Sequence, residues 1–573
     1  MRYNSTKRIY LLSFTATALS LVLVTRLFFI QIVNGDDYSK RADRQYVKPS
    51  SDIMSRGSIF FQEKSGALVS AATLKTVFII AINPNILNAI DRAYSQINEV
   101  VRIDRNSFFE KALKKNDPYE IVTRLEDGYL ADKIENLEIP GVGVYKESVR
   151  FYPADRLSAH VLGIVARSKD EGDRYAGRYG LERFYDFTLR QDNSSFKTNF
   201  FAEIFSGVKK TVTDDGSSLL TGDIVSSIEP NVQLYLTKEL SVLKEKWNPN
   251  SLGGIIIEPK TGRMVAATFL PDFDPGDFGK ENDISIFGNP MVESVFEFGS
   301  IIKPLTMSAG IDAEVITPET KYDDLGFVYL NGKRVENHDK KVMGRVDMQA
   351  VLDNSLNTGA IFVMQKLGKD RFRSYMESFG LGEKTGIDLP SETSGLTKNL
   401  RSRYEIDYTT PAFGQGIALT PIGAVRALSV LANGGLLVRP KIIDRIDGKA
   451  GVSKIFETSV QGRVLKQKTV EDVTRMLVHA FDEGLLGGMY KFKQYSVAAK
   501  TGTAEIPKEG GGYSEKYLHS FFGYFPAYNA RFLVLLYMVD PKNGARFSSE
   551  TLSLPFANIT KFLLNYYEIP PDR

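Results

Sequence analysis

The chain has 573 residues, of which 43% are hydrophobic and 25% are charged. At about 100–200 residues per domain, this ordinary globular composition predicts three or four domains and excludes a wholly disordered chain, a collagen-like fibre and a many-pass membrane protein. The formal net charge of +3 argues against a dedicated nucleic-acid binder, which usually carries a basic stripe.

Cysteine is absent, which excludes disulfides, cysteine-based zinc sites, iron–sulfur clusters and thiolate nucleophiles. None of the four histidines lies at metal-ligand spacing from another; they are His160, His338, His479 and His519. No local motif supports a histidine-driven triad, so a catalytic base is expected to be a lysine or a carboxylate.

Residues 9–33 contain a single charge, Arg26, and are long enough to cross a bilayer core. Basic residues in the preceding segment, 1–8, predict a cytoplasmic N-terminus and an extracytoplasmic remainder. The alternative is a cleaved signal peptide ending near Ala16–Ala18, but too few apolar residues precede that site. We therefore expect a single-pass anchor in the cell membrane.

After the anchor, Asp36–Arg56 has the composition of a polar stalk, and short strands at Thr76–Ile82 and Gly141–Tyr145 flank a helical segment, Ile86–Ile103. Residues 206–223 are rich in Gly, Ser and Asp, which is typical of a linker. The predicted organisation is a cytoplasmic tail (1–8), an anchor (9–33), a first extracytoplasmic domain (34–205), the linker (206–223) and a second domain (224–573).

The second domain alternates helix and strand signals. Val232, Leu236, Leu240 and Leu243 share one face of a helix. Gly253–Glu258 and Arg263–Phe269 flank a Pro-Lys-Thr-Gly turn, and further strands are expected at Ser520–Phe525 and Arg531–Val539, with a closing helix at Leu552–Tyr566. Helices at both ends of an antiparallel sheet indicate an α+β fold.

The first chemical motif is Ser300-Ile301-Ile302-Lys303, preceded by Gly299. On a helix from Ser300 to about Ala313, the two polar side chains lie one turn apart on the same face. A serine hydroxyl needs an adjacent base, and a lysine amine serves only if its pKa falls through burial, the helix dipole or a second cation. Ser-x-x-Lys also occurs at Ser194 and Ser241, so this pattern alone is weak.

Two further motifs follow. Ser355-Leu356-Asn357 reads as a loop between helices, although such residues commonly form caps and turns. Lys500-Thr501-Gly502-Thr503 follows a short apolar run that predicts a buried strand becoming an edge, where Gly502 would admit a ligand close to the backbone. The Lys-Thr-Gly copies at Lys260 and Lys384 read as a turn and a loop.

The order Ser-x-x-Lys, Ser-x-Asn and Lys-Thr-Gly is the signature of penicillin-binding proteins and serine β-lactamases. With it, the chain resembles a class B penicillin-binding protein, and within that family most resembles the septal transpeptidase of cell division. Further segments resemble the anchor exit, the elongated pedestal domain and the transpeptidase domain of the family; they are Arg26–Tyr38, Arg150–Pro153, Ala159–Gly163, Gly180–Glu182, Leu189–Arg190, Gly414–Ile417, Ala432–Gly435, Gly511–Tyr513 and Phe521–Pro526.

Three features depart from the family pattern. Phe298 stands where proline is common, and Ile301 where threonine is frequent, but neither change touches Ser300 or Lys303. The pedestal motif starting at Arg56-Gly57 has altered residues and closes two places late, at Gly66. About residues 75–145 have no counterpart in the resemblance.

The resemblance implies acyl transfer on peptidoglycan stem peptides ending in D-Ala-D-Ala, without a metal or organic cofactor. Ser300 would be the nucleophile and Lys303 its base. Ser355 would pass a proton to the leaving D-Ala, Asn357 would hold Lys303 and the substrate amide, and Lys500 would keep the site cationic.

The hydroxyls of Thr501 and Thr503 would bind the terminal carboxylate, and backbone N–H groups of Ser300 and Thr503 would form the oxyanion hole. β-Lactams are expected as covalent inhibitors. A multi-pass membrane glycosyltransferase and other division proteins are expected as partners.

Two other classes of protein remain open. A membrane-bound carboxypeptidase or β-lactamase would use the same serine with water as acceptor, and a division scaffold or β-lactam sensor would keep the fold without turnover. Within the family, Asn357 and the lack of a long C-terminal extension favour division over elongation.

Overall fold

A computed structural model of the protein describes residues 26, 55–114, 117–168, 174–190, 220–448, 451–508 and 510–573. These form two compact units, one containing residues 74–149 and the other containing residues 56–73 and 150–573. The predicted anchor lies outside the described residues except for Arg26, as does most of the predicted linker. Within the described ranges, no helix is both long and apolar enough to cross a membrane.

The smaller unit corresponds closely to the segment that has no counterpart in the family resemblance. Strands β3 (Glu120–Leu125) and β4 (Val142–Phe151) both pair with β2 (Leu68–Ile82), and the helices are α3 (Ile90–Val100), α4 (Arg105–Ala112) and α5 (Gly128–Glu135). Its core contains Ile80, Ile97 and Phe108. The helix expected over Ile86–Ile103 is shorter, because a turn at Asn83 precedes it and extended backbone at Val101 ends it.

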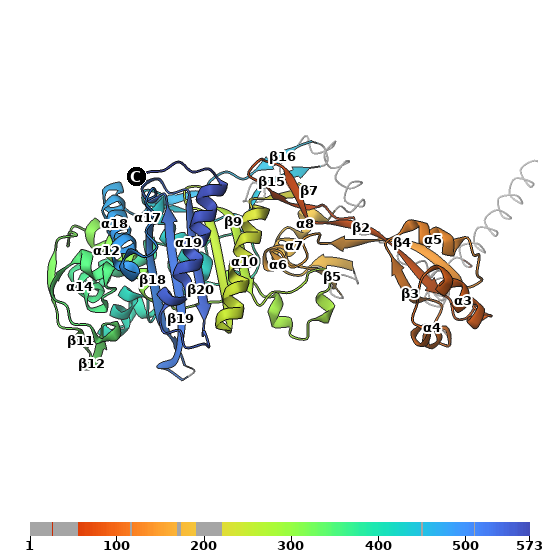
Figure 1. Ribbon diagram of the computed structural model, residues 1–573, viewed down its shortest axis with the longest axis horizontal. Helices are drawn as coiled ribbons and strands as arrows, with labels where there is room; N and C mark the ends of the chain where they lie inside the picture. Colours follow the sequence, from red (N-terminus) through yellow and green to blue (C-terminus); the bar gives the residue numbers. More distant parts are fainter. Residues whose placement is uncertain are drawn as a thin grey trace, which may run out of the picture. The chain divides into compact units, whose positions relative to one another are not determined.

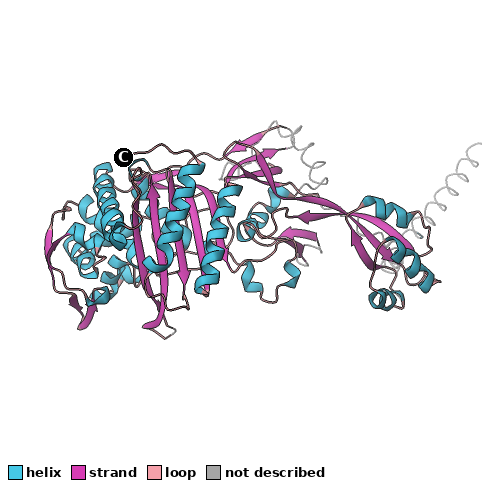
Figure 2. Ribbon diagram, viewed as in Figure 1, coloured by secondary structure: helices cyan, strands magenta, loops and turns pink. Residues whose placement is uncertain are grey.

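The larger unit contains an antiparallel five-stranded sheet in the order β18-β19-β20-β8-β9. Figures 1 and 2 show helices α10 and α19 packed across one face of it. The elements are β8 (Ser251–Glu258), β9 (Arg263–Leu270), β18 (Ala498–Pro507), β19 (Tyr513–Phe525), β20 (Phe532–Val539), α10 (Pro230–Trp247) and α19 (Ser548–Tyr566). The expected strands and helices of this part are thus confirmed, with β19 longer than predicted.

Helix α10 illustrates why these segments fold as they do. Pro230 occupies its first turn, and the side chain of Glu229 accepts the N–H of Val232 as an N-cap. The apolar face predicted from the spacing is buried: Leu236 and Leu240 pack with α19 residues such as Phe556 and with the sheet. The neighbouring Ser241, from a second Ser-x-x-Lys match, bonds only to the carbonyl of Thr237 on the same helix.

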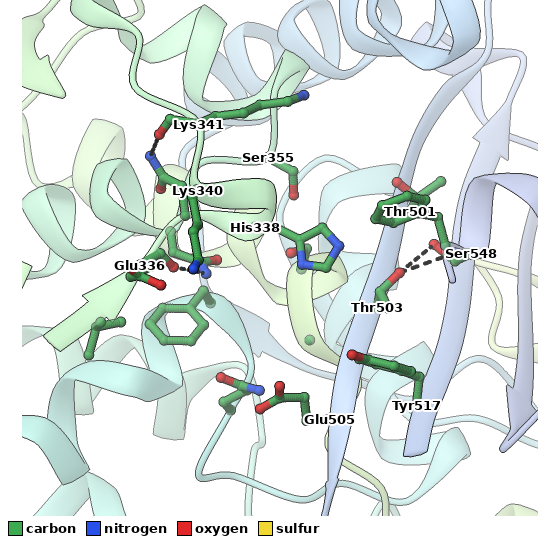
Figure 3. A pocket seen from close by; sticks show the side chains of 18 of the residues that line it. Glu336, His338, Lys340, Lys341, Ser355, Thr501, Thr503, Glu505, Tyr517 and Ser548 are labelled. Atoms are coloured by element: carbon green, nitrogen blue, oxygen red, sulfur yellow. Dashed lines mark hydrogen bonds between the residues drawn. The ribbon is translucent and has the colours of Figure 1, made fainter. Parts of the chain in front are cut away.

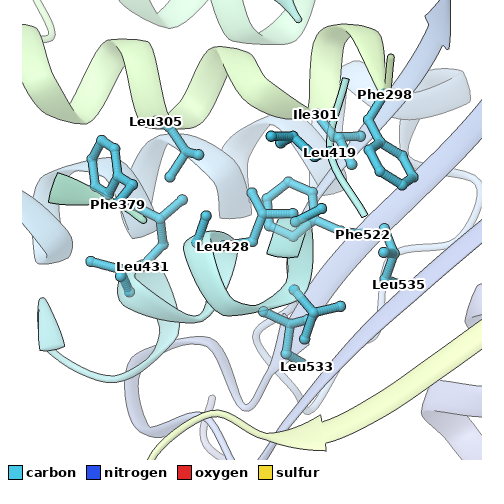
Figure 4. Packing of buried hydrophobic residues seen from close by; sticks show 14 of the residues in the cluster. Phe298, Ile301, Leu305, Phe379, Leu419, Leu428, Leu431, Phe522, Leu533 and Leu535 are labelled. Atoms are coloured by element: carbon cyan, nitrogen blue, oxygen red, sulfur yellow. The ribbon is translucent and has the colours of Figure 1, made fainter. Parts of the chain in front are cut away.

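A second, helical layer covers the other face of the sheet. Its main helices are α12 (Lys303–Asp312), α13 (Met348–Asp353), α14 (Asn357–Leu367), α15 (Lys369–Ser378), α17 (Pro421–Ala432) and α18 (Gln467–His479). Helix α17 is buried along its whole length. Figure 4 shows its Leu428 and Leu431 packed with Leu305 of α12 and with Phe522 and Leu533 of the sheet.

The remaining described part of the larger unit combines segments of the predicted first domain with three strands from residues 222–455. Strand β1 (Ile59–Gln62) pairs antiparallel with β2 and parallel with β7 (Gly222–Ser226), which pairs with β15 (Ile443–Gly448) and through it with β16 (Ser453–Ile455). Short helices α6 (Ala159–Leu162), α7 (Gly180–Phe184) and α8 (Asp186–Leu189) and the hairpin of β5 (Val165–Ser168) and β6 (Arg174–Gly177) accompany them. Gly222 and Asp223 therefore belong to a strand rather than to the predicted linker.

A buried ion network joins the segments around Arg56, Arg150 and Glu182. Glu182, fully buried, accepts from Arg56 at 2.6 Å and from Arg150 at 2.6 Å, and both arginine side chains are at most 3% exposed. Arg56 also contacts Asp186 at 2.8 Å. The predicted polar stalk therefore ends before Arg56, because this guanidinium is held in the interior by two carboxylates.

Replacement of Glu182 by glutamine is expected to lower the free energy of unfolding by about 3–5 kcal/mol, because two buried guanidinium groups lose their shared charge partner. Chemical unfolding of the purified protein, followed by near-UV circular dichroism, measures the change. Lys468→Ala, which removes an exposed partner of Asp472, is the matched control and should change stability by less than about 1 kcal/mol. Equal small effects of both substitutions would contradict the structural role of Glu182.

Candidate active site

The three predicted motifs meet at one cleft in the larger unit. The cleft has a volume of about 690 Å³, and its lining includes Ser300, Ser355, Asn357, Thr501 and Thr503. A neighbouring cavity of about 290 Å³ shares Ser355 and Thr501 and is also lined by Lys500. Lys303 lies beneath these cavities and is 1% exposed.

Ser300 lies in the short 3-10 helix η5 (Gly299–Ile302), which continues directly into α12 at Lys303. The predicted α-helix from Ser300 thus begins as a tighter turn, and Pro304, which has no N–H to donate, is tolerated because it falls in the first turn of α12. Phe298 and Ile301 anchor this segment in the core beside Phe522 and Leu419 (Figure 4).

Close backbone approach fixes the position of η5. Gly299 has φ +62°, and a Cβ there would lie 3.1 Å from the carbonyl oxygen of Thr503 on β18. Its N–H donates to the carbonyl of Gly414 at 3.1 Å. Glycine is favoured here because this positive φ is costly for other residues and because a side chain would press against Thr503 and Ala504 of β18.

Gly502 lies on β18, the strand that Gly299 of η5 approaches. A Cβ at Gly502 would lie 2.6 Å from the carbonyl oxygen of Phe298 and 2.4 Å from Oγ of Ser520. Protein atoms therefore fill the space beside the Cα atom of Gly502, and Gly502 is not among the residues that line the cleft. Its neighbours Thr501 and Thr503 do line it, because successive residues of a strand face opposite sides. The expected approach of a ligand to the backbone of Gly502 stays a prediction.

The Lys303 side chain extends to the loop that carries Ser355. Its Nζ donates to the carbonyl oxygen of Ser355 at 2.5 Å and to Oγ of the same residue at 3.2 Å. Ser355 has φ +53°, which turns its carbonyl and hydroxyl toward the same nitrogen. No carboxylate pairs with Lys303 in the part of the chain that the structure describes.

Burial lowers the pKa of Lys303 well below its usual value, and the nearby charge of Lys500 lowers it further. Burial also lowers the pKa of Lys500, to about 8, and the carboxylate of Asp353 partly opposes this shift. The lowered pKa favours the neutral amine of Lys303, which is the form that can accept a proton. Burial is the larger cause of the lowered pKa of Lys303, and the charge of Lys500 is the smaller one.

Asn357 is the first residue of α14, and its amide donates to the carbonyl of Glu336 at 2.9 Å. The expected contact between Asn357 and Lys303 is not among the hydrogen bonds of the described residues. Asn357 nonetheless lines the cleft beside Ser355 and Ser300.

Other residues of the cleft were not predicted as site residues. His338 projects into it between Ser355 and Thr501 (Figure 3), and its ring meets Phe547 edge to face. On the far side, the Tyr513 hydroxyl donates to Glu297 at 3.0 Å. No local chemical motif marks His338, whereas Tyr513 lies in the segment Gly511–Tyr513 that resembles the family.

A serine beside a buried, low-pKa lysine, with a second cation and hydroxyl-bearing strand residues nearby, provides a nucleophile, a base and an anion site for acyl transfer. The comparisons agree with this chemistry. Residues 253–559 match the model described as penicillin binding protein transpeptidase domain, and residues 54–203 match the penicillin-binding protein dimerisation domain. The chain therefore belongs to the class B penicillin-binding proteins. It is a serine-type peptidoglycan D,D-transpeptidase, the activity for which relatives along most of the chain are named.

Individual relatives are distant but extend along nearly the whole chain. Stage V sporulation protein D of Bacillus subtilis is 27% identical over 99% of this chain and 87% of its own. The peptidoglycan D,D-transpeptidase FtsI homolog of Mesostigma viride is 26% identical over 98% and 96%.

Solved structures share the fold. Penicillin Binding Protein 2X from Streptococcus thermophilus superposes with a TM-score of 0.72 at 17% identity, covering 90% of this chain and 80% of its own. Penicillin binding protein 3 from Mycobacterium tuberculosis, complexed with aztreonam, gives a TM-score of 0.63 at 24% identity over 75% and 92%.

Gly502→Ala is expected to reduce the rate of acylation by a fluorescent penicillin at least tenfold, since the new methyl group must separate β18 from η5. Overpacking of this kind typically costs about 1–3 kcal/mol. Gly279→Ala is the control, because a Cβ at Gly279 meets no atom within 4 Å. Acylation of Gly502→Ala at the wild-type rate would contradict the tight contact between the two segments.

Proposed function

We propose that this protein cross-links stem peptides during septal wall synthesis, with Ser300 as nucleophile and Lys303 as its general base. The observation that carries the proposal is the buried Lys303 amine, which bonds to Ser355, has no carboxylate partner among the described residues and has a lowered pKa. A neutral amine has two N–H groups and one lone pair. With both N–H groups directed at Ser355, the lone pair remains for the hydroxyl of Ser300, one turn earlier.

In the proposed first step, Lys303 takes the proton of Ser300, whose oxygen attacks the carbonyl of the penultimate D-Ala. The backbone N–H groups of Ser300 and Thr503 stabilise the resulting oxyanion; losing one such donor typically costs about 10²–10³ in rate. The bond to the terminal D-Ala then breaks, and its nitrogen receives a proton from Lys303 through Ser355. An ester between Ser300 and the donor peptide remains.

In the second step, the amine of a neighbouring stem peptide attacks this ester. A new amide bond forms, the ester bond breaks, and the proton of the amine returns to the oxygen of Ser300 through the same lysine. Thr501 and Thr503 hold the terminal carboxylate of the donor, Lys500 supplies a cation beside it, and Asn357 orients the substrate amide. No step in this scheme needs a metal ion or an organic cofactor.

β-Lactams are proposed to acylate the same serine. A β-lactam presents a strained amide and a carboxylate in the arrangement of the D-Ala-D-Ala end, and its acyl-enzyme retains the leaving group. The family model that matches residues 253–559 is described by its penicillin binding, and a relative with the same fold is described as complexed with aztreonam.

The septal role is the finer part of the proposal. It is supported by the sequence resemblance and by relatives named FtsI, among them that of Escherichia coli, 23% identical over 96% of this chain. Relatives with other names, Stage V sporulation protein D and MrdA, match at similar identity. The septal role therefore does not rest on sequence identity alone.

The proposal includes an anchor at residues 9–33 and an extracytoplasmic catalytic domain, supported by the uncharged run and the basic residues before it. Strand polymerisation would then require a separate multi-pass membrane glycosyltransferase. Co-purification of the full-length chain with a membrane polymerase, lost on deletion of residues 1–33, would support this part.

Ser300→Ala is expected to abolish covalent labelling by a fluorescent penicillin and release of D-Ala from a D-Ala-D-Ala peptide, because no other group is proposed to form the ester. Gel fluorescence measures the first readout and chromatography the second. Ser241→Ala, in the half-buried Ser-x-x-Lys match of α10, should label like the wild type. Absence of label on the wild type would favour a non-catalytic scaffold.

A D-amino acid acceptor separates transfer from hydrolysis. With the wild-type protein, donor peptide and a D-amino acid, we expect an exchange product in which the new residue replaces the terminal D-Ala. Release of D-Ala without that product would favour a carboxypeptidase.

Lys500→Gln is expected to move the acidic limb of the pH–acylation profile to higher pH. Removing a neighbouring cation stabilises protonated Lys303 and so raises its pKa, which leaves less neutral base at a given pH below that value. The profile of the wild type should rise as Lys303 loses its proton and fall above about pH 8, where Lys500 loses its charge. An acidic limb that does not move would exclude electrostatic coupling between the two lysines.

A further inference from the structure

One wall of the cleft is formed by a segment that no sequence motif marked. Residues 337–343, named here the cleft strap, connect β12 (Lys333–Glu336), which pairs with β11 (Phe327–Leu330), to β13 (Gly344–Asp347), which pairs with β10 (Lys321–Asp324). His338, Lys340 and Lys341 of the strap line the cleft. Figure 3 shows them on the side that faces Thr501 and Thr503.

A buried carboxylate holds the strap in place. Asp324 is 0% exposed and accepts four hydrogen bonds: from the backbone N–H groups of Gly326 and Met343, the amide of Asn337 and the hydroxyl of Thr358. Their distances are 2.7–3.0 Å. Both ends of the strap, Asn337 and Met343, are therefore tied to the same side chain.

The same network joins the strap to the Ser355–Asn357 motif. The side-chain oxygen of Asn337 accepts from the N–H of Thr358 at 3.1 Å, and Thr358 directly follows Asn357 at the start of α14. The amide of Asn337 also donates to the carbonyl of Lys341. The strap thus has a fixed position relative to the catalytic loop, which suits a group that orients a substrate.

The strap presents two lysine side chains to which the described side chains offer no ion-pair partner. The side chains of Lys340 and Lys341 are exposed, and within the described residues neither ammonium has an ion pair or a hydrogen bond. Arg334 on the same wall differs, because it pairs with Glu336 at 3.0 Å. Lys340 also has φ +54°, an uncommon conformation for lysine.

We propose that Lys340 and Lys341 bind a second carboxylate of the donor stem peptide, upstream of the terminal D-Ala-D-Ala. This inference rests on the proposed function, in which Thr501 and Thr503 hold the terminal carboxylate on the facing wall. A donor held by one carboxylate on each wall lies across Ser300 in a single direction. The ammonium of an acceptor peptide is repelled by the same two lysines, which directs it to another approach.

The test uses two pentapeptide donors that are identical except that the upstream carboxylates are free in one and amidated in the other. For the double variant Lys340→Gln and Lys341→Gln, kcat/KM for D-Ala release from the free-carboxylate donor is expected to fall about fivefold to tenfold, the size of two exposed ion pairs. The amidated donor should change less than about twofold. Raising the salt concentration should reduce the wild-type preference in the same way.

Lys333→Gln is the matched control, because this exposed lysine lies on β12 outside the cleft and should leave both donors unaffected. Equal losses for the two donors, or no loss for either, would overturn the inference. Penicillin carries only the counterpart of the terminal carboxylate, so its labelling of Ser300 should be unchanged in the double variant. Failure of the wild type to label would instead overturn the proposed function.

Discussion

The burial of the Lys303 amine is the constraint on which the rest of the cleft depends. An ammonium that is 1% exposed loses most of its hydration, and a second buried lysine raises the free energy of the charged form further. A carboxylate beside Lys303 would restore the charge, and the described residues place none there. Asp353 acts on Lys500 instead, where its carboxylate partly opposes the lowering of the pKa by burial.

This electrostatic arrangement requires a rigid scaffold, because its groups come from three separate segments: the turn with Ser300 and Lys303, the Ser355 loop and β18 with Lys500. Phe298 and Ile301 fix the serine segment in the core between the sheet and α17. Gly299 and Gly502 allow the backbone of η5 and β18 to approach within a distance that no side chain would permit. Ser355 itself has a left-handed backbone conformation, and its carbonyl oxygen and its hydroxyl both accept hydrogen bonds from Nζ of Lys303.

Much of this could be predicted from the sequence, because the information is local. The apolar spacing of α10, the turn between β8 and β9 and the order of the three motifs each lie within a few residues. The motif glycine Gly502 was assigned correctly to the edge strand, but its packing against Phe298 depends on residues 204 positions earlier and was not visible. Packing against Phe298 and Ser520 is thus a reason for glycine at position 502 that the local sequence does not reveal.

Features that depend on long-range contacts could not be predicted from the sequence. The local composition places Arg56 at the end of a polar stalk, because its buried partner Glu182 lies 126 residues later. The strap has no sequence signature, because its supporting carboxylate, Asp324, and its tie to α14 through Thr358 depend on contacts between separate segments. Both are buried polar groups, whose role depends on partners that only the fold supplies.

A direct titration of Lys303 tests the central claim. In protein labelled with ¹³C and ¹⁵N at lysine, the Lys303 resonance is assigned by its disappearance in Lys303→Arg, and its chemical shift is followed with pH. We predict that it titrates well below the ordinary lysine pKa of about 10.5 and that the midpoint rises in Lys500→Gln. A Lys303 resonance that titrates near the ordinary value would contradict the account, because the serine would then have no neutral base at physiological pH.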